Sequence, residues 1–436
     1  MAWVIKLCEV GEGKRRERSI FKLADLAAPI SIEQLGLNLE QGKALMAAIQ
    51  NAVISVQATA LAEHAKSIVR SEPGVIVKDY RLRRIQTVYG SAELRFPRLQ
   101  RGGVVELCTD WPSHCRSTPE FDDLRMTLAA WMSYRAAEQL LRGLLPIAGG
   151  GHHTTFRNRV LDQGDATEAS GLPENPAETM SLGLDCTFIR SHDPARGRLH
   201  EVLIGHIEPH TGNPRVFSSI GETGQGRVSR IKRSLAQAGL VDATSVTTFT
   251  DGGAGLRELA FASGLTNKPI LDWHHIAQRL QHVRQAAMGL KTSVPDLPDV
   301  TAKIIAEVER LRWRLWHGKP NAVAEALETI RQLIRTPRKR TKTRRPLRPW
   351  NALMSSLFFL NKYTSGQEAW MINYARRHQE GARVGTSQTE SAANYLVNKR
   401  MNKSQQMRWS EIGARRLLQV RAAVINSDLV GIPMAA

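Results

Sequence analysis

Two aspartates occupy positions in predicted β-strands where chemistry is a better explanation than packing. Residues 180–189 read MSLGLDCTFI, and the strict alternation of apolar side chains predicts a half-buried strand with Asp185 in its middle. Aspartate is disfavoured inside strands, so its presence needs a reason. A second predicted strand, TTFT at 247–250, leads directly into Asp251, Gly252 and Gly253. A solvent-facing edge position would explain Asp185 without function, and metal binding would explain both residues.

A third acid, Glu390, lies at the start of a predicted helix in the segment GTSQTES at 385–391. Three carboxylates on separate elements of one α/β core can converge on divalent metal ions, because hard cations prefer oxygen ligands. The structural alternative is a capping box, in which Ser387 and Glu390 only cap the helix.

The region that holds the two aspartates alternates between strand and helix patterns. We expect strands at 180–189, 198–208, 215–220, 247–250 and 269–273, with helices at 226–239 and 255–263. Three strands, a helix, a strand, a helix and a strand is the order of a ribonuclease-H-like fold. In that fold, acids in the middle of the first strand and at the end of the fourth lie side by side.

Charge and composition narrow the class of partner. The 436 residues allow two to four domains, and a net charge of +19 favours a polyanion such as nucleic acid over an anionic membrane surface or simple solubility. We find no apolar run near 18 residues and therefore expect no transmembrane helix. Four cysteines give no disulfide framework, which fits a reducing cytosol. Among them, Cys108 and Cys115 would supply at most half of a metal site.

Basic residues concentrate near the C-terminus. From 335 to 436 the chain holds 19 Lys and Arg against five Asp and Glu. Prolines at 337, 346 and 349 predict an extended basic loop over 335–349 that can follow a phosphate backbone, unless it is only a solvated linker. The residues expected to bind DNA there are Arg338, Lys339, Arg340, Lys342, Arg344 and Arg345.

Composition shifts suggest six regions. We expect a helical region at 1–72, a small basic β region at 73–118 and a helix-turn-helix-like region at 119–170, in which Arg157 and Arg159 would face DNA. The α/β core would span 176–275 and resume with helices at 381–425. Between its parts, 276–380 would form an all-α insertion. Tryptophans in this insertion can stack on unpaired bases or pack in its core.

Three sequence blocks carry a resemblance to a known family. The segment TDGGAG around Asp251, LDWHHIAQRL at 271–280 and TESAANYLVNKRMNKSQQMRWS at 389–410 resemble a bacterial DDE insertion-sequence transposase. The nearest group is the ISKra-like branch, related to Mutator-type elements, and the similarity covers roughly residues 120–425. It implies that Asp185, Asp251 and Glu390 form a catalytic and metal-binding triad.

The resemblance also implies a pair of residues beside the active site. In similar enzymes an acid or cysteine is followed three positions later by a histidine, which corresponds here to Asp272 and His275. This sequence has His274 where an aromatic residue is expected, so either histidine can serve. The helix after Glu390 would hold DNA through Lys399, Arg400, Lys403 and Arg408.

The expected chemistry is phosphodiester cleavage followed by 3′-hydroxyl strand transfer. Two Mg²⁺ ions, with Mn²⁺ able to substitute, can activate water and neutralise the phosphate. Our hypothesis is that Asp185 bridges both ions while Asp251 and Glu390 each secure one. The partners implied are double-stranded DNA, as terminal inverted repeats and target, and further copies of the chain in a homodimer or larger assembly. The expected location is the bacterial cytoplasm, at the nucleoid, with no membrane partner.

Three alternatives remain open at this point. A ribonuclease-H-like nuclease or resolvase can use the same acids, although the long segment between Asp251 and Glu390 favours transposition. A transposase-derived protein that only binds DNA needs no metal. A zinc enzyme built on His152 and His153, or on His274 and His275, is disfavoured because adjacent histidines on a helix point in different directions.

Overall fold

The chain folds into two compact units, residues 1–169 with 427–436 and residues 170–426. The computed structural model describes residues 3–11, 14–23, 32, 35–111, 116–147, 152–167, 175–293, 298–319, 321–340, 348–385, 387–402 and 407–428. Each unit is considered separately below.

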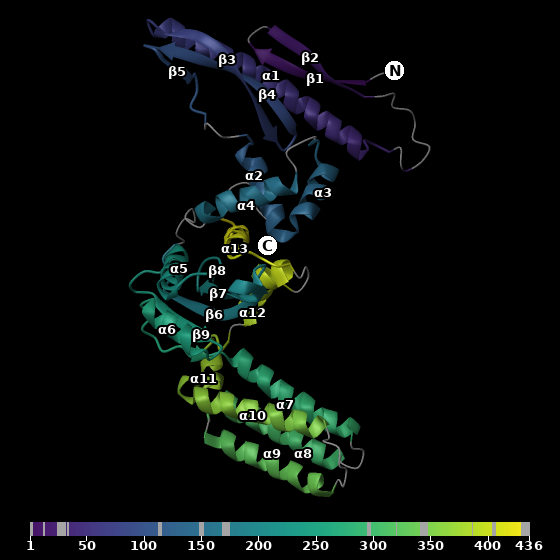
Figure 1. Ribbon diagram of the computed structural model, residues 1–436, viewed down its shortest axis with the longest axis vertical. Helices are drawn as coiled ribbons and strands as arrows, with labels where there is room; N and C mark the ends of the chain where they lie inside the picture. Colours follow the sequence, from purple (N-terminus) through teal and green to yellow (C-terminus); the bar gives the residue numbers. More distant parts are fainter. Residues whose placement is uncertain are drawn as a thin grey trace. The chain divides into compact units, whose positions relative to one another are not determined.

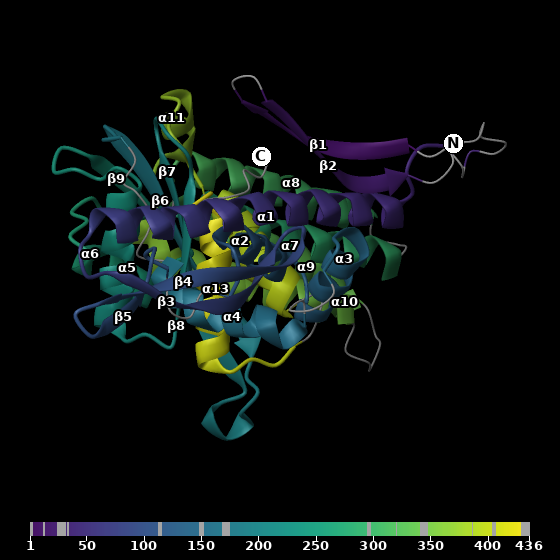
Figure 2. The ribbon, with the colours of Figure 1, turned by 90° about the horizontal axis from the view of Figure 1, so that it is seen from above.

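The first unit combines a long helix with two small antiparallel sheets. Strands β1 (Trp3–Gly11) and β2 (Lys14–Leu23) form a hairpin, and β3 (Ile76–Thr87), β4 (Gly90–Arg101) and β5 (Val104–Leu107) form a three-stranded sheet. Helix α1 (Leu39–Ser71) packs on this sheet and contacts β2 (Figure 2). A capping box between Asn38 and Gln41 fixes the start of α1.

Three helices complete the first unit. They are α2 (Pro119–Trp131), α3 (Tyr134–Leu144) and α4 (His153–Thr167), and they contact one another pairwise. Phe121 and Phe156 are fully buried at their centre. The helices predicted for 119–163 are therefore present; whether this cluster enters a DNA groove stays a prediction.

The second unit is built on a five-stranded sheet with strand order β10-β9-β6-β7-β8 (Figure 1). Its strands are β6 (Thr179–Arg190), β7 (Leu199–Pro209), β8 (Arg215–Ile220), β9 (Ser245–Thr250) and β10 (Ile270–Leu271). Strand β7 pairs antiparallel with β6 on one side and with β8 on the other, whereas β9 pairs parallel with both β6 and β10. The predicted order of strands and helices in this region is confirmed.

Helices cover the sheet and close its core. Helices α5 (Gly224–Gln237) and α6 (Ala254–Ala262) bury Ile231, Leu235 and Ala260 against strand residues such as Leu182 and Leu203. The sheet also contacts the C-terminal elements, which are α12 (Ser387–Ala392), the π-helix η4 (Ala393–Asn402) and α13 (Glu411–Ile425). Gly239 ends the turn after α5 with φ 91°, and a β-carbon there would meet the Asn175 carbonyl oxygen at 2.3 Å.

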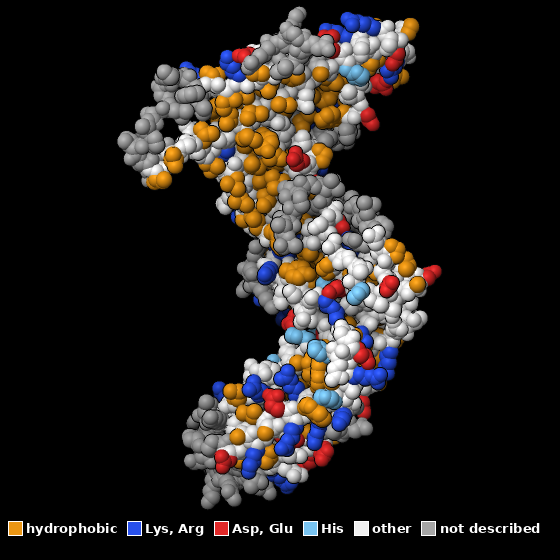
Figure 3. Space-filling view, turned by 180° about the vertical axis from the view of Figure 1, so that it is seen from behind, with side chains coloured by type: hydrophobic (Ala, Val, Ile, Leu, Met, Phe, Trp, Pro, Cys, Tyr) orange, Lys and Arg blue, Asp and Glu red, His pale blue; other side chains and the backbone are white. Residues whose placement is uncertain are grey.

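A helical bundle is inserted between β10 and α12 (Figure 1). Its members are α7 (Trp273–Ser293), α8 (Pro298–Trp316), α9 (Asn321–Arg340) and α10 (Arg348–Gln367), followed by the short η3 (Glu368–Trp370) and α11 (Tyr374–Gln379). Leu280, Leu311, Ile330 and Leu357 lie in its apolar core. Lys and Arg side chains are spread over one of its faces (Figure 3).

Two expectations about secondary structure are wrong. The helical region at 1–72 includes the β1–β2 hairpin, where Trp3, Ile5 and Leu7 alternate with other residues in the period of a strand. The basic loop predicted for 335–349 is wrong over 335–340, because α9 continues through Pro337 to Arg340, and residues 341–347 lie outside the described part of the chain. One proline removes a single helical hydrogen bond and does not always end a helix. Helix α1 is long and apolar enough, by length and composition alone, to cross a membrane. A single helix of this kind is weak evidence for a membrane span and does not overturn the expectation that there is none.

Candidate active site

Asp185 lies in β6, and Asp251 directly follows the last residue of the neighbouring strand β9. Because Leu184 is the parallel partner of Thr250, the two aspartates follow at the same level, where β9 ends. Neighbouring strands are about 4.8 Å apart. Each carboxylate is oriented locally: Asp185 Oδ1 accepts a hydrogen bond from the Cys186 amide at 2.7 Å, and Asp251 Oδ1 accepts one from the Gly253 amide at 2.8 Å.

The negative charges of Asp251 and Glu390 both act on the carboxyl group of Asp185. Burial raises the pKa of Asp185, the Cys186 amide and the nearby His275 lower it, and the negative charges of Asp251 and Glu390 raise it again. The carboxylates of Asp251 and Glu390 are therefore close enough to act electrostatically on Asp185. A cation among them would relieve this repulsion.

Glu390 reaches the site from the short helix α12, which contacts β6 and β7. Its carboxylate lies in contact with His274 Nε2, at the start of α7. The residue that precedes α12 lies outside the described part of the chain, and the contact described for the Glu390 carboxylate is the one with His274. The arrangement favours a functional role over a purely capping one.

Asp272 organises the two adjacent histidines. It is 1% exposed, and its Oδ1 accepts a hydrogen bond from the His274 amide at 2.8 Å while its Oδ2 lies 3.9 Å from His275 Nε2. A β-carbon at Gly385 would stand 2.6 Å from Asp272 Oδ1, so only glycine allows this approach. The sequence left open which histidine serves; His274 pairs with Glu390, and His275 lies near Asp185.

Two polar residues of the inserted bundle hold the Asp251 turn, and the sequence analysis missed both. Tyr363 Oη donates a hydrogen bond to the Asp251 carbonyl at 2.8 Å, and Gln367 Nε2 donates one to the Gly252 carbonyl at 2.9 Å. They lie one helical turn apart on α10, which is a pattern too common to have singled them out. The insertion therefore braces the acid-bearing strand end.

A cavity of about 710 Å³ adjoins Asp251 and is lined in part by Cys186, Glu201 and Arg227. Burial raises the pKa of Cys186 to about 12, and the neighbouring Glu201 adds to this effect. Cys186 is thus protonated at neutral pH and is not a nucleophile. Arg227 pairs with Glu201 at 3.0 Å.

The residues predicted to bind DNA differ in their exposure to solvent and in their partners. Arg157, Lys399 and Arg408 are exposed and remain candidates. Arg159 forms an ion pair with Asp122 inside the first unit.

The prediction that Arg400 binds DNA is wrong. Its side chain is 1% exposed and lies over the Trp409 ring at 5.4 Å, where DNA does not reach it. Helical periodicity turns this position inward although its neighbour Lys399 faces solvent. Arg338, Lys339 and Arg340 are helical in α9 instead of lying in a loop. Four further predicted residues lie outside the described part of the chain: Lys342, Arg344, Arg345 and Lys403.

The remaining metal prediction is that Cys108 and Cys115 supply half of a metal site. Cys8, Cys108 and Cys186 form no disulfide among the described residues, and Cys115 lies outside them.

A scan against models of known protein families finds no match for this chain, and a search of curated proteins finds none either. The site must therefore be interpreted from its own residues.

Proposed function

We propose that this chain is a metal-dependent DNA transposase of the DDE type, which cleaves the strand at element ends and joins the freed 3′-hydroxyl to target DNA. The observation that carries the proposal is the pairing of Leu184 with Thr250, which brings Asp185 and Asp251 together, with Glu390 within electrostatic reach. Three acids from β6, the end of β9 and α12 thus act on one another electrostatically from distant parts of the sequence, although among the described residues their ligand atoms do not all lie within 4.8 Å of one another.

The topology supports the same proposal. Three antiparallel strands, then parallel strands added on the other side of β6, agree with the ribonuclease-H-like core proposed for this unit. The helical bundle between β10 and α12 agrees with the insertion of the resembling transposases. A simple nuclease has no evident need for such an insertion, which favours strand transfer as the outcome.

The donor set fits hard divalent cations. The oxygens of Asp185, Asp251 and Glu390 are the ligands that Mg²⁺ and Mn²⁺ prefer. Burial first, and then the negative charges of Asp251 and Glu390, raise the pKa of Asp185, and a bound cation would favour its charged form. Bound there, two such ions would supply an activated water and neutralise charge on the scissile phosphate. The cavity beside Asp251 gives room for a nucleotide.

The residues around the acids have positioning roles in this proposal. His274 holds the Glu390 side chain, and Asp272 holds His274 through its amide. Tyr363 and Gln367 fix the backbone that presents Asp251. Exposed Lys399, near Glu390 in sequence, is suited to a DNA phosphate.

The test is a cleavage and joining assay on DNA that flanks the coding sequence of this chain on both sides. Full-length protein is incubated with labelled flanking fragments and a supercoiled target plasmid, with Mg²⁺ or Mn²⁺ or with EDTA. We expect metal-dependent 3′-hydroxyl ends and joined products, both lost in Asp185→Asn. Cleavage without joining would indicate a nuclease, binding without cleavage would indicate a DNA-binding protein, and either result would overturn the proposal.

A further inference from the structure

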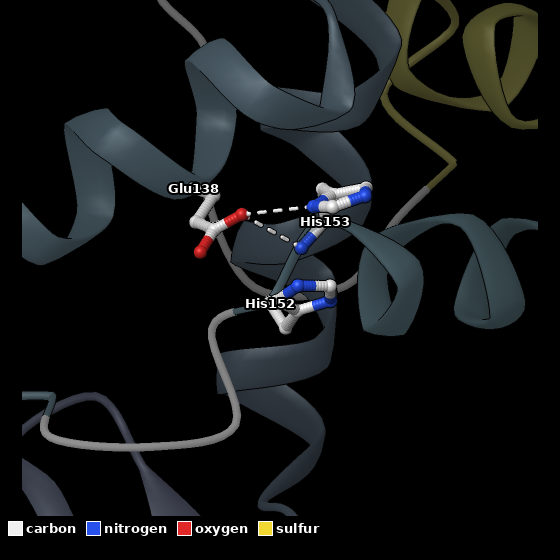
Figure 4. A group of neighbouring side chains, drawn as sticks. All are labelled: Glu138, His152 and His153. Carbon is white, nitrogen blue, oxygen red and sulfur yellow. Dashed lines mark hydrogen bonds and ion pairs between the residues drawn. The ribbon is translucent and has the colours of Figure 1, made fainter.

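Two histidines and a glutamate come together between α3 and α4 in the first unit (Figure 4). We propose that Glu138, His152 and His153 bind a Zn²⁺ ion. One potential ligand atom from each residue lies within 4.8 Å of the others, and among the described residues this is the cluster that satisfies such a distance for a single ion. The site is separate from the three acids, and its proposal does not rest on strand cleavage.

The adjacent histidines converge because only one of them is helical. Helix α4 begins at His153, and His152 precedes it in non-helical backbone. Their rings are 4.1 Å apart between centroids, at 38° to each other. The expectation that adjacent histidines diverge holds within a helix and fails at its start. Thr154 Oγ1 lies 2.8 Å from His152 Nδ1 and helps to hold that ring in place.

Glu138 supplies the acidic donor from the facing helix α3. Its Oε2 lies 3.3 Å from His153 Nδ1, and its Oε1 is 3.1 Å from an Arg142 nitrogen. The carboxylate would thus bind through Oε2 alone. Two imidazoles and one carboxylate are a donor set that suits Zn²⁺ and leaves a fourth position for water, whereas Mg²⁺ and Ca²⁺ prefer oxygen ligands only.

The competing explanation is that Glu138 only caps α4. The His153 amide donates a hydrogen bond to Glu138 Oε2 at 2.9 Å, and the positive end of the helix disfavours a nearby cation. The carboxylate offsets that partial charge, and each of its oxygens has two lone pairs, so Oε2 can keep the amide and still bind metal. Glu138 is 13% exposed and His153 33%, so an ion can enter from solvent.

A zinc ion here would fasten the start of α4 to α3. Helix α4 carries the exposed Arg157, which remains a candidate for DNA contact. Fixing the orientation of α4 would fix the direction of that side chain. Zinc would then stabilise the first unit and sharpen DNA binding without entering the chemistry at Asp185.

The experiment measures zinc binding directly on the full chain. Protein is stripped with EDTA, dialysed and titrated with ZnCl₂ in competition with a chromogenic chelator, and Co²⁺ absorption reports the ligand set. We expect one ion per chain and a loss of affinity of more than about tenfold in His152→Ala and in Glu138→Gln. His152 is exposed, so its substitution leaves the fold intact.

Glu138→Gln separates the two explanations, because its amide oxygen still accepts the His153 amide while the negative charge is gone. The matched control is His64→Ala, an exposed histidine on α1, which should bind zinc as the unaltered protein does. Unaltered protein that fails to retain zinc against the chelator would overturn the proposal. Equal zinc affinity in Glu138→Gln, His152→Ala and the control would overturn it as well.

Discussion

Replacing Asp185 by asparagine should abolish strand cleavage and, without metal, make the protein more stable. Asp185 is held beside Asp251 by the strand register and is exposed to the charge of Glu390 as well. Asparagine has nearly the same shape, and its oxygen can still accept the hydrogen bond from the Cys186 amide. The substitution therefore removes mainly the negative charge.

The size of the gain is estimated from the usual spacing of neighbouring strands. Charges about 5 Å apart, close to the strand spacing, repel by about 3 kcal/mol at an effective dielectric constant near 20 and by about 1 kcal/mol in water. We expect Asp185→Asn to raise the free energy of unfolding by about 1–3 kcal/mol at neutral pH. For a domain of this size each kcal/mol corresponds to about 2–4 °C in Tm.

The pH dependence has a definite sign. The pKa of Asp185 is raised in the folded state above its ordinary value of 3.8, so ionisation costs stability. That cost is absent below the unfolded value, grows as pH rises from 3.8 to the folded pKa, and is complete above it. The advantage of Asp185→Asn should therefore shrink as the pH falls toward 3.8.

The assay is thermal unfolding followed by circular dichroism, in EDTA and in Mg²⁺. Asp242→Asn, an exposed aspartate in the same unit, is the matched control and should change Tm little. Mg²⁺ should raise the Tm of the unaltered protein more than that of Asp185→Asn. If Asp185→Asn is less stable than the unaltered protein in EDTA, the acids do not repel one another and the reasoning fails.

Four further predictions concern other residues. Glu390→Gln should retain DNA binding in a gel-shift assay but lose Mg²⁺-dependent cleavage, and wild-type cleavage rates would contradict its role. Arg400→Ala should lower the free energy of unfolding by about 2–4 kcal/mol in a urea titration, since Arg400 is buried. Lys399 is exposed, so Lys399→Ala should leave stability unchanged and should reduce the slope of log DNA affinity against log salt concentration by about one. Burial raises the pKa of Cys186 to about 12, so iodoacetamide at pH 8 should alkylate the exposed Cys8 before Cys186. Mass spectrometry of timed samples measures the order, and alkylation of Cys186 first would contradict the prediction.

The sequence predicted the order of elements in the α/β core from local patterns, although the alternation in β6 fails at its end, where Phe188 is exposed and Ile189 is buried. The alternation around Asp185 and the glycine after α5 are local signals, and local signals identify elements. The convergence of Glu390 on the site had no local signal of its own. It came from family resemblance, since no periodicity relates a residue on α12 to one on β6.

Other features depended on tertiary structure that no short segment encodes. Pro337 predicted a loop, yet α9 extends through it. Arg400 and Lys399 are adjacent basic residues, and only the packing of η4 decides that one is buried beside Trp409. The contacts from Tyr363 and Gln367 to the Asp251 turn join elements far apart in sequence, so they could not be foreseen.

The most direct test of the central claim is an anomalous-scattering map from crystals of the full chain soaked in Mn²⁺. The account predicts strong peaks coordinated by the carboxylate oxygens of Asp185, Asp251 and Glu390 together, with His274 released from Glu390 or retained beside it. Ordered Mn²⁺ bound elsewhere, with these three carboxylates free of metal, would contradict it.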